Sequence, residues 1–575
     1  MCGLFGSVGL ALTPTQQRAA INALRGRGPD SQGQWSEGQA TLLHTRQPIQ
    51  DLSPLGHQPM ASPSGDLVLV FNGEIYNQQE LRRELEGHGR SFHSHSDTEV
   101  LLQGLRQWGS GLWDRLNGIF AVAAWEPQQQ RLTLARDGFG VKPLLWHRDG
   151  NSCAFGSELS AFEATGLASR RQLNPDALDS YSFWGAVTAP ASLLAGVEVF
   201  PAGHWGHWTA ERGWQLQRFD DSQAPLAAVP TSLPEATAAV EQALQQAVTR
   251  QVIGDVPVGL FLSGGLDSGL LGALLREQHG GTIHSVSVGF RNLPGAVDES
   301  NLAEATARQL HLSHTTLRIG RPELEASFDG FLDAIDQPSI DGFNSFLVAR
   351  AAAAGGMRVA FSGLGADELF GGYGHMGSLD ARALLRVRRI HGHGLPRHRQ
   401  RQLIAQQAQL VPGGQAHGGP VVPLRNCSQL ELAGYLQNTL LRDGDAVSMH
   451  HGLELRVPFL DRDLVQLALA IPEPLHRAEG PKTLLRCLAA RRLPAEVLSA
   501  PKRGFNLALA PWLQGAPRFA PRRILGLLHR HLSPQGLRVG RRGFWGSWAL
   551  LQSSGRWGPY WRWVVLAEWL ERGGF

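Results

Sequence analysis

The sequence predicts two unlike folding units in one chain, an α+β layered sandwich followed by an α/β doubly wound parallel sheet. Short strands with a few helices among them fill residues 1–210, whereas strands and helices alternate regularly after residue 235. A stretch rich in Pro and Gln, near Asp220–Pro234, separates the two patterns. At 575 residues the chain is also too long for a single hydrophobic core, so two or more domains are expected.

The first unit is inferred from short apolar runs that end in turn residues. Two helices, over Gln78–Glu86 and Thr98–Trp108, are expected among the strands. This mixture is typical of sheets covered by helices, and it places the first domain at residues 1–210. The expected strands are Leu67–Phe71, Ile119–Trp125, Arg131–Ala135 and Ala154–Ser157.

The second unit begins after a linker that we place at residues 211–234. A long helix rich in Ala, Gln and Leu is expected over Glu235–Gln251, and apolar strands alternate with helices after it. We place this domain at residues 235–532 and a C-terminal extension at residues 533–575. The expected strands are Val256–Leu262, Ile283–Gly289 and Val359–Ser362.

Two segments stand apart from these patterns. Residues 377–422 are rich in Arg, His, Gln and Gly, which indicates a solvated surface insertion rather than a site for an anionic partner or a metal. The extension 533–575 is rich in Trp, and Trp561–Leu570 carries apolar residues at helical spacing. That spacing predicts a helix packed on the main body rather than a membrane anchor.

The composition is that of an ordinary soluble globular protein, with 42% hydrophobic and 18% charged residues. No apolar run reaches the roughly 18–20 residues that span a bilayer, so no membrane partner is expected. The net charge of +3 is too small to indicate a nucleic-acid partner. The four cysteines lack metal-ligand spacing, which predicts a reduced, cytoplasmic protein without structural zinc. Small-molecule substrates are the expected partners, and a homodimer is the candidate assembly.

Lysine is rare in this chain. It occurs only as Lys142, Lys482 and Lys502, although the chain has 53 lysines and arginines together. A chain that uses arginine for nearly all its cationic positions is expected to keep lysine where a compact ammonium with three rotatable donors is needed. Each of the three is therefore a candidate for a specific role.

The residue after Met1 is a cysteine, in Met1-Cys2-Gly3-Leu4-Phe5-Gly6. Removal of Met1 would leave Cys2 with a free α-amine, so that one residue would carry a thiol and a weak base. An α-amine titrates near pH ~8 and a thiol near ~8.5, so a small shift in either pKa is enough for chemistry at neutral pH. Cys2 is thus a candidate nucleophile, and a cysteine without function is the alternative.

The first of two glycine-rich loops follows the expected strand Val256–Leu262, and a helix is expected directly after it. Glycines let a backbone close around phosphates, and a helix N-terminus adds N–H groups and a positive dipole end. The loop lacks the Gly-Lys-Ser/Thr ending of a Walker loop, so it predicts a pyrophosphate leaving group and adenylation rather than kinase chemistry. A glycine turn without a ligand is the alternative. The loop residues are Ser263, Gly264, Gly265, Leu266, Asp267 and Ser268.

A second loop follows the expected strand Val359–Ser362 and runs to Tyr373. Asp367 in this loop is expected to meet Asp267 of the first loop at the ends of neighbouring strands. The two carboxylates would supply hard oxygen ligands for one Mg²⁺ ion. The alternative is a structural turn with a solvated Asp367–Glu368 pair.

Together these motifs resemble the glutamine-dependent asparagine synthetase family, and the resemblance covers nearly the full length of the chain. The N-terminal third is similar to a class II glutamine amidotransferase of the Ntn-hydrolase type, and the rest to an ATP-pyrophosphatase synthetase domain. The segments that carry the first similarity are Cys2-Gly3, Arg27-Gly28-Pro29-Asp30, Phe71–Asn77, Ser96–Glu99, Arg136-Asp137 and Gly140–Leu144. Those that carry the second are the two loops, Leu441-Arg442-Asp443, Ser448–Asp461 and Gly480–Arg486.

The resemblance implies a glutaminase site. Cys2 would attack the side-chain amide of glutamine and form a thioester, and Asn72 and Gly73 would form the oxyanion hole. Arg46 would bind the α-carboxylate of glutamine with two hydrogen bonds, and Glu74 and Asp97 would hold its α-ammonium. The residues implied to bind glutamine in these roles are Arg46, Asn72, Gly73, Glu74 and Asp97.

The resemblance also implies an ATP site. Lys482 would be the catalytic lysine that faces the α-phosphate and the acyl-adenylate, and Asp267 and Asp367 would hold Mg²⁺. Leu262 and Val288 would line the adenine pocket. The residues implied to contact ATP are Leu262, Ser263, Gly264, Gly265, Asp267, Ser268, Val288, Ser362 and Gly363.

One position departs from the family. Its members usually carry Asp or Glu third in the second loop, where a general-base role has been assigned to it, and this chain has Leu364. Either Glu454, which we favour because it lies in a matched segment, or Asp336 would then act as base, or the acceptor is not aspartate. Relatives of the family form amides on other carboxylates, including β-lactams and peptide macrolactams.

The sequence thus predicts a glutamine-hydrolysing asparagine synthase, an AMP-forming ligase that uses ATP and Mg²⁺. One site would adenylate L-aspartate, the other would release ammonia from L-glutamine, and a channel between the domains would join them. A sugar acid or a peptide carboxylate is the alternative acceptor. A non-catalytic scaffold or regulatory relative is the alternative outside the enzyme class.

Overall fold

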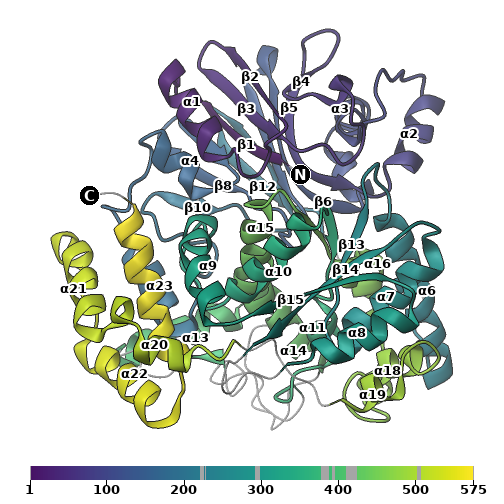
Figure 1. The fold of residues 1–575 in the computed structure, drawn as a ribbon. Coiled ribbons are helices and arrows are strands. Elements are labelled where there is room, and N and C mark those ends of the chain that lie inside the picture. Colours follow the sequence, from purple (N-terminus) through teal and green to yellow (C-terminus); the bar gives the residue numbers. More distant parts are fainter. Residues whose placement is uncertain are drawn as a thin grey trace.

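A computed structural model describes residues 2–220, 226, 228–291, 298–376, 388–390, 395–409, 424–500 and 507–573. In Figure 1 the N-terminal part (purple and blue) lies above the parallel sheet of the second part, and the last helices (yellow) pack to one side. Lys502 and most of the predicted insertion at 377–422 lie outside the described residues.

The first 220 residues contain two antiparallel six-stranded sheets, ordered β10-β8-β9-β1-β3-β2 and β12-β11-β7-β6-β5-β4. The first sheet consists of β1 (Cys2–Val8), β2 (Ser31–Glu37), β3 (Ala40–Arg46), β8 (Leu145–Asp149), β9 (Ser152–Gly156) and β10 (Val197–Val199). The second consists of β4 (Met60–Ala61), β5 (Val68–Ile75), β6 (Gly118–Glu126), β7 (Arg131–Arg136), β11 (His204–Thr209) and β12 (Gly213–Arg218). The four strands predicted in this part are β5, β6, β7 and β9, with shifted ends.

The two sheets pack face to face, with a buried apolar layer between them that includes Leu4 of β1, Val70 of β5 and Leu134 of β7. Helices α1 and α4 cover the outer face of the first sheet, and α2 and α3 cover the outer face of the second. Four layers result, and β1 lies in the middle of the first sheet. The helices are α1 (Pro14–Ala23), α2 (Gln78–Gly87), α3 (Asp97–Trp108), α4 (Leu159–Ala164) and α5 (Pro175–Trp184).

Regular structure continues beyond residue 210. Strand β12 pairs with β11, and its Trp214 ring lies 4.9 Å from that of Trp146 in the other sheet. The segment predicted as a linker, residues 211–234, therefore begins with an edge strand of the sandwich. It ends in the first residues of helix α6 (Leu233–Gln251). The domain boundaries themselves stay a prediction.

The second part is built on a five-stranded parallel sheet, as predicted, with the order β15-β14-β13-β16-β17. The chain enters in the middle at β13, builds outward to β15, and then returns to β16 on the other side of β13. The carboxyl ends of β13 and β16 are thus the switch point at which doubly wound sheets bind ligands. The strands are β13 (Val258–Phe261), β14 (His284–Phe290), β15 (Ser313–Ile319), β16 (Val359–Phe361) and β17 (Glu454–Arg456).

Helices cover both faces of this sheet. Helices α6 and α7 (Leu266–Gln278) pack on one face, against Leu260, and α10 (Phe343–Ala354) packs on the other, against Val286. A π-helix, Leu432–Leu441, joins α14 to α15. The remaining helices are α8 (Ser300–Gln309), α9 (Arg321–Ala334), α11 (Ala366–Phe370), α13 (Arg397–Ala408), α14 (Leu424–Glu431), α15 (Arg442–Met449), α16 (Arg462–Ala470), α17 (Glu473–His476), α18 (Thr483–Ala489) and α19 (Ala495–Ser499).

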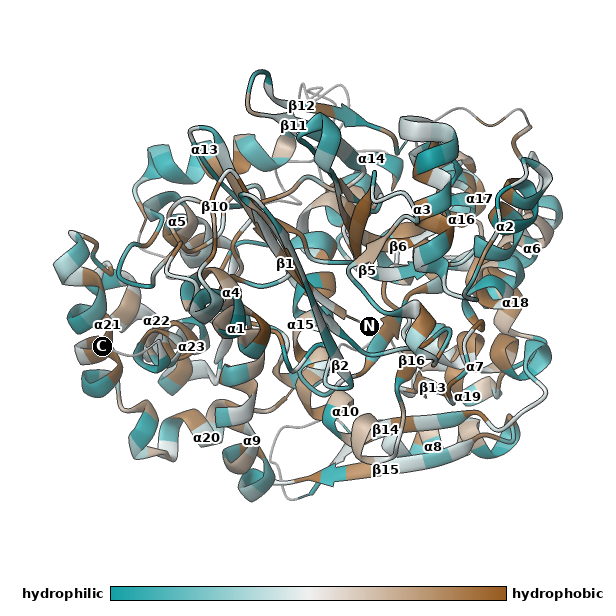
Figure 2. Cartoon of the chain, turned by 90° about the horizontal axis from the view of Figure 1, so that it is seen from above, coloured by the Kyte–Doolittle hydropathy of each residue, from teal (hydrophilic) through white to brown (hydrophobic). Residues whose placement is uncertain are grey.

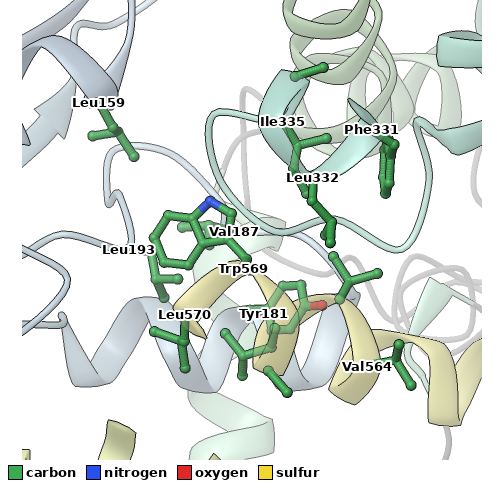
Figure 3. Packing of buried hydrophobic residues seen from close by; sticks show 14 of the residues in the cluster. Leu159, Tyr181, Val187, Leu193, Phe331, Leu332, Ile335, Val564, Trp569 and Leu570 are labelled. Carbon is green, nitrogen blue, oxygen red and sulfur yellow. The ribbon is translucent and has the colours of Figure 1, made fainter. Parts of the chain in front are cut away.

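The C-terminal helices join the two parts. Figure 3 shows Trp569 and Leu570 of the last helix among Leu193 of the first part and Leu332 of the second. This helix is buried from Tyr560 to Leu570, which confirms the prediction of a packed helix there. The helices are α20 (Ala510–Gly515), α21 (Pro521–Leu532), α22 (Arg541–Ser554) and α23 (Gly558–Arg572).

Hydropathy follows this layering. In Figure 2 the inner strands β5 and β6 carry mostly hydrophobic residues, whereas α13, from the predicted surface insertion, is largely hydrophilic. Among the residues that the structure describes, no helix has both the length and the apolar character needed to cross a membrane.

Candidate active site

Cys2 begins β1, the strand that lies between β3 and β9 in the first sheet. Its backbone nitrogen donates a hydrogen bond of 3.2 Å to Oδ1 of Asn72, and its carbonyl accepts one of 3.1 Å from Nε of Arg27. Burial raises the pKa of the Cys2 thiol, while the positive amino terminus of the chain and the Gln47 amide lower it. A thiol in this position needs a local base, because burial disfavours the thiolate.

Asn72 and Gly73 lie next to Cys2, near the end of β5. The Asn72 side chain is fully buried; its oxygen binds the Cys2 nitrogen, and its Nδ2 has no hydrogen-bond partner among the described residues. Gly73 has a φ of 156°, and a Cβ there would overlap the carbonyl oxygen of Ile119. An oxyanion hole needs N–H donors that are free to bind a developing negative charge. The side-chain amide of Asn72 and the backbone at Gly73 can supply such donors.

Charged side chains surround this pair. Arg46 is opposite Cys2 in the β1–β3 register, and its guanidinium donates to the carbonyls of Ser53 (2.9 Å) and Asp51 (2.6 Å). Asp97, the first residue of α3, accepts a hydrogen bond of 3.0 Å from the Ile75 amide. Glu74 accepts one from the side-chain amide of Gln50.

The two acids beside Cys2, Glu74 and Asp97, are buried, and a bound cation would stabilise their charged forms. Burial raises the pKa of Asp97 to about 6. Burial also raises the pKa of Glu74 well above its ordinary value, and the charges of Glu454 and Asp97 raise it further. An ammonium group placed between Glu74 and Asp97 would relieve this repulsion. The structure thus brings all the residues predicted to bind glutamine to one place.

The first phosphate loop (residues 263–268) follows β13 at the switch point. The Ser263 hydroxyl lies 2.8 Å from the Ser268 hydroxyl and accepts a hydrogen bond from the Gly265 amide, which closes the loop before α7. A cavity of about 170 Å³ opens beside it. Its lining includes the predicted Leu262, Ser263, Gly264 and Val288 together with Asn344 and Ser345 of α10. Asn344 and Ser345 had no motif that marked them in the sequence.

The second phosphate loop (residues 362–373) meets the first through Lys482. The Lys482 ammonium lies 2.6 Å from a carboxylate oxygen of Asp267 and 2.6 Å from one of Asp367. Burial lowers the pKa of Lys482, but the two carboxylates outweigh it and the pKa is raised. Lys482 has a φ of 57°, an unusual value for a residue other than glycine, so its position before α18 is held by its surroundings.

The backbone of the second loop is shaped around this cluster. Ser362 follows β16 directly, and a Cβ at Gly363 would lie 3.2 Å from Cβ of Asp267. A Cβ at Gly372 would overlap both Asp367 and the end of the Lys482 side chain. Two carboxylates at the edge of a cavity, with glycines that leave room for phosphates, fit a Mg²⁺ ion bound jointly by protein and nucleotide. Asp267 and Asp367 would be its protein ligands.

Comparison with known proteins identifies the family. A family model for asparagine synthase matches residues 239–545, more than half of the chain, and one for a glutamine amidotransferase domain matches residues 1–220. The chain belongs to the asparagine synthase family.

Relatives named as asparagine synthetases match over most of their length. Glutamine-hydrolyzing asparagine synthetase 3 of Bacillus subtilis (strain 168) is 28% identical over 87% of this chain and 86% of its own. A putative glutamine-hydrolyzing asparagine synthetase of Mycobacterium tuberculosis (strain ATCC 25618 / H37Rv) is 29% identical over 86% of this chain and 84% of its own. A solved structure of glutamine phosphoribosylpyrophosphate amidotransferase from B. subtilis, complexed with ADP and GMP, overlaps with a TM-score of 0.30 at 15% identity, over 55% of this chain and 65% of that one.

In this member of the asparagine synthase family, Leu364 packs among apolar residues instead of presenting a carboxylate. Its neighbours form a cluster at the boundary between the two parts, with Tyr76 and Val141 from the first and Leu441 and Val457 from the second. Leu364 thus adds to this cluster, which we call the apolar boundary between the two parts, on the side of the second loop.

The two carboxylates considered as replacements for the family acid lie elsewhere. Glu454 is fully buried at the amino end of β17, and it accepts a hydrogen bond of 2.7 Å from Nε of Arg456. Asp336 accepts hydrogen bonds from the amides of Leu159 (2.9 Å) and Ser160 (3.3 Å) at the start of α4. Asp336 is thus bound to a helix of the first part, although burial raises its pKa to about 7. In Glu454 the second carboxylate oxygen, Oε2, has no hydrogen-bond partner among the described residues.

Sequence reasoning gave no role to a further buried carboxylate, Asp443. Asp443 is buried, its pKa is raised by burial to about 6, and Arg442 binds it at 2.8 Å. The next residue, Gly444, faces Leu364: a Cβ there would lie 3.8 Å from Leu364 Cδ1. The family segment around Leu441 includes Asp443, but nothing in the sequence marks its carboxylate as buried.

Proposed function

We propose that the chain is a glutamine-hydrolysing asparagine synthase, a ligase that converts aspartate, glutamine, ATP and water into asparagine, glutamate, AMP and pyrophosphate. Two catalytic centres divide the work. The centre at Cys2 releases ammonia from glutamine, and the centre at Asp267, Asp367 and Lys482 activates the acceptor carboxylate. A cytoplasmic location is part of this proposal, and a homodimer stays a prediction.

At the first centre, the α-amine exposed by removal of Met1 takes the thiol proton, and the Cys2 sulfur attacks the glutamine side-chain carbonyl. Because the Asn72 oxygen already binds the Cys2 nitrogen, its unpartnered Nδ2 is directed to receive the oxyanion, together with the backbone N–H of Gly73. The C–N bond breaks as the α-amine returns its proton to the leaving ammonia. Water then hydrolyses the thioester to glutamate.

At the second centre, the β-carboxylate of aspartate attacks the α-phosphorus of ATP and pyrophosphate leaves. Mg²⁺ on Asp267 and Asp367 would neutralise charge on the phosphates, and Lys482 moves from these carboxylates toward the α-phosphate as its charge grows. Ammonia then attacks the acyl carbon, AMP leaves, and a base removes the excess proton. We assign this base to Asp443, whose pKa of about 6 keeps it ionised at neutral pH.

Ammonia would pass between the centres through the apolar boundary. Residues of both parts meet there in one cluster, among them Ile119 and Val141 of the first and Leu436 and Val457 of the second. A lining of this kind accepts neutral ammonia, whereas it disfavours ammonium because a buried charge loses its hydration. Transfer would therefore deliver the nucleophile in its reactive form.

The ion triad Asp267–Lys482–Asp367 at the switch point, in a chain of the asparagine synthase family, carries this proposal. Its test is an assay with aspartate, glutamine and MgATP, in which asparagine, AMP and pyrophosphate must form in equal amounts. A protein that hydrolyses glutamine but makes no asparagine would contradict aspartate as acceptor. A screen for AMP release over sugar acids and peptide carboxylates would then identify the alternative, which Leu364 in place of the family acid favours.

A further inference from the structure

A row of buried charges crosses the boundary between the two parts. Glu74, beside Cys2, lies 3.8 Å from the Arg456 guanidinium, which in turn binds Glu454 at 2.7 Å. Glu74 belongs to β5 of the first part, whereas Arg456 and Glu454 are the two ends of β17. All three side chains are at most 5% exposed, so water screens their interaction weakly.

The Arg456 guanidinium is hydrogen-bonded through two of its nitrogens but not through the third. Its Nε binds Glu454 and its Nη1 donates to the carbonyls of Gln251 and Ile253, whereas its Nη2, the atom that faces Glu74, has no hydrogen-bond partner among the described residues. A buried guanidinium N–H without an acceptor is unfavourable. A shift of less than about 1 Å would bring Nη2 within hydrogen-bonding distance of Glu74.

Glutamine supplies a cause for that shift. Burial raises the pKa of Glu74, and the charges of the buried carboxylates Glu454 and Asp97 raise it further, so the cluster lacks positive charge. The α-ammonium of glutamine would provide it, and Glu74 would then carry a full negative charge toward Arg456. The attraction between Glu74 and Nη2 would increase at the moment when glutamine binds.

Strand β17 connects Arg456 to the other centre. The Arg456 carbonyl accepts a hydrogen bond of 2.9 Å from the amide of Ser362, the first residue of the second phosphate loop. In the parallel register Arg456 is paired with Phe361, one residue before this loop. A movement of Arg456 is therefore passed to the loop through a single backbone hydrogen bond.

We propose that Arg456 is a positioning residue that couples occupancy of the glutamine site to the conformation of the second phosphate loop. This role rests on the proposed function, because it requires glutamine at Glu74 and nucleotide at the loop. The coupling is reciprocal: glutamine changes the affinity for MgATP by the same factor by which MgATP changes the affinity for glutamine.

Equilibrium binding to a Cys2→Ala protein tests the proposal, because this variant binds glutamine without consuming it. Calorimetry would measure the dissociation constant of MgATP with and without saturating glutamine, in the absence of acceptor. We expect glutamine to change it about fivefold or more, and Arg456→Lys, added to Cys2→Ala, to reduce the change to less than about twofold. Lysine keeps the charge but loses the planar set of donors that binds Glu454 and both carbonyls while Nη2 faces Glu74.

Arg492→Lys in the same background is the matched control. Arg492 also binds two carboxylates, Glu241 and Glu277, but all three lie in the second part, so the coupling should be retained. Equal coupling factors in the Arg456 and Arg492 variants, or no coupling in Cys2→Ala itself, would overturn the proposal. A protein that binds neither ligand would instead contradict the proposed function.

A second measurement does not depend on the folding of the Arg456 variant. In the Cys2→Ala protein, glutamine alone should change hydrogen–deuterium exchange at the Ser362 amide, whose acceptor is the Arg456 carbonyl. Exchange at residues 359–363 that is the same with and without glutamine would show that the strand does not respond, and it would contradict the proposal.

Discussion

At the scale of single residues, the scarcity of lysine identified sites where charge is placed in the interior. Lys142 and Lys482 are both buried, and each binds carboxylates, Asp445 in one case and Asp267 with Asp367 in the other. Arginine covers nearly all other cationic positions. Lys482 can hold two carboxylates and later turn to a phosphate because an ammonium donates in three directions and swings on a flexible stem.

This view predicts that Lys482→Arg is nearly as damaging as Lys482→Ala. A guanidinium is too wide to fit between Asp267 and Asp367 and cannot place one compact charge on the α-phosphate. Both variants should lower aspartate-dependent ATP–pyrophosphate exchange by about 10²-fold or more, the usual effect of removing one group that stabilises developing charge. Glutamine hydrolysis provides the internal control, and exchange at the wild-type rate in Lys482→Arg would refute the role of the ammonium.

A second prediction distinguishes Asp443 from Glu454 as the base. With ammonia as nitrogen source, Asp443→Asn should lower asparagine formation by about 10²-fold or more, while pyrophosphate exchange continues, because only the proton transfer after adenylation is lost. Glu454→Gln should spare ammonia-dependent synthesis, since Glu454 is bound to Arg456. If Glu454→Gln blocks synthesis after adenylation and Asp443→Asn does not, the assignment from sequence was right and ours from the structure is wrong.

At the scale of elements, strands were predictable where a local pattern decided them. The strands β13, β14 and β16 were predicted from short apolar segments, and β13 and β16 end in glycine-rich loops. The parallel sheet and the meeting of the two loops at neighbouring strand ends were therefore predicted, whereas the switch point became visible only with the strand order. Strand β17 has only three residues, and its place beside β16 depends on a tertiary pairing. Strand β12 was placed in a linker because its exposed residues are polar, whereas its sheet position depends on pairing with β11.

For the residues of the two centres, too, local motifs could be predicted from the sequence, whereas contacts between distant segments could not. Cys2 and Asp267 were named because their chemistry is local, and Asn72 was named through the resemblance to the family. The ion pair of Arg456 with Glu74 and the approach of Gly444 to Leu364 join segments that are far apart in the chain, and no periodicity indicates them. Glu454 was favoured as base for its motif alone, but the motif does not show that Arg456 already holds it.

The second phosphate loop offers a matched test of backbone shape. Gly372→Ala should abolish pyrophosphate exchange, because the added methyl group would overlap Asp367 and Lys482. Gly374→Ala is the control, since a Cβ there has no atom within 4 Å. Both variants should hydrolyse glutamine normally. Equal exchange rates in the two variants would mean that the loop does not need the close approach seen here.

At the scale of the whole molecule, the two centres belong to one tightly joined body. Arg27 shows this directly: it contacts the Cys2 carbonyl, Glu158 at 3.0 Å and Asp445 of the second part at 2.7 Å, and it is 1% exposed. The C-terminal helix adds a second connection, since the Tyr181 hydroxyl donates to the Arg562 carbonyl at 2.6 Å. Ammonia released at one centre is thus formed at a fixed position relative to the other.

A Cys2→Ala variant shows whether the two centres divide the reaction between them. With aspartate and MgATP, the rate of asparagine formation would be measured once with glutamine and once with ammonium chloride as nitrogen source. We expect no glutamine-dependent product above background, because no thioester can form. We expect ammonia-dependent product within about threefold of wild type, because ammonia reaches the adenylate without Cys2. Loss of both reactions in a folded Cys2→Ala protein, or glutamine-dependent synthesis that survives, would contradict it.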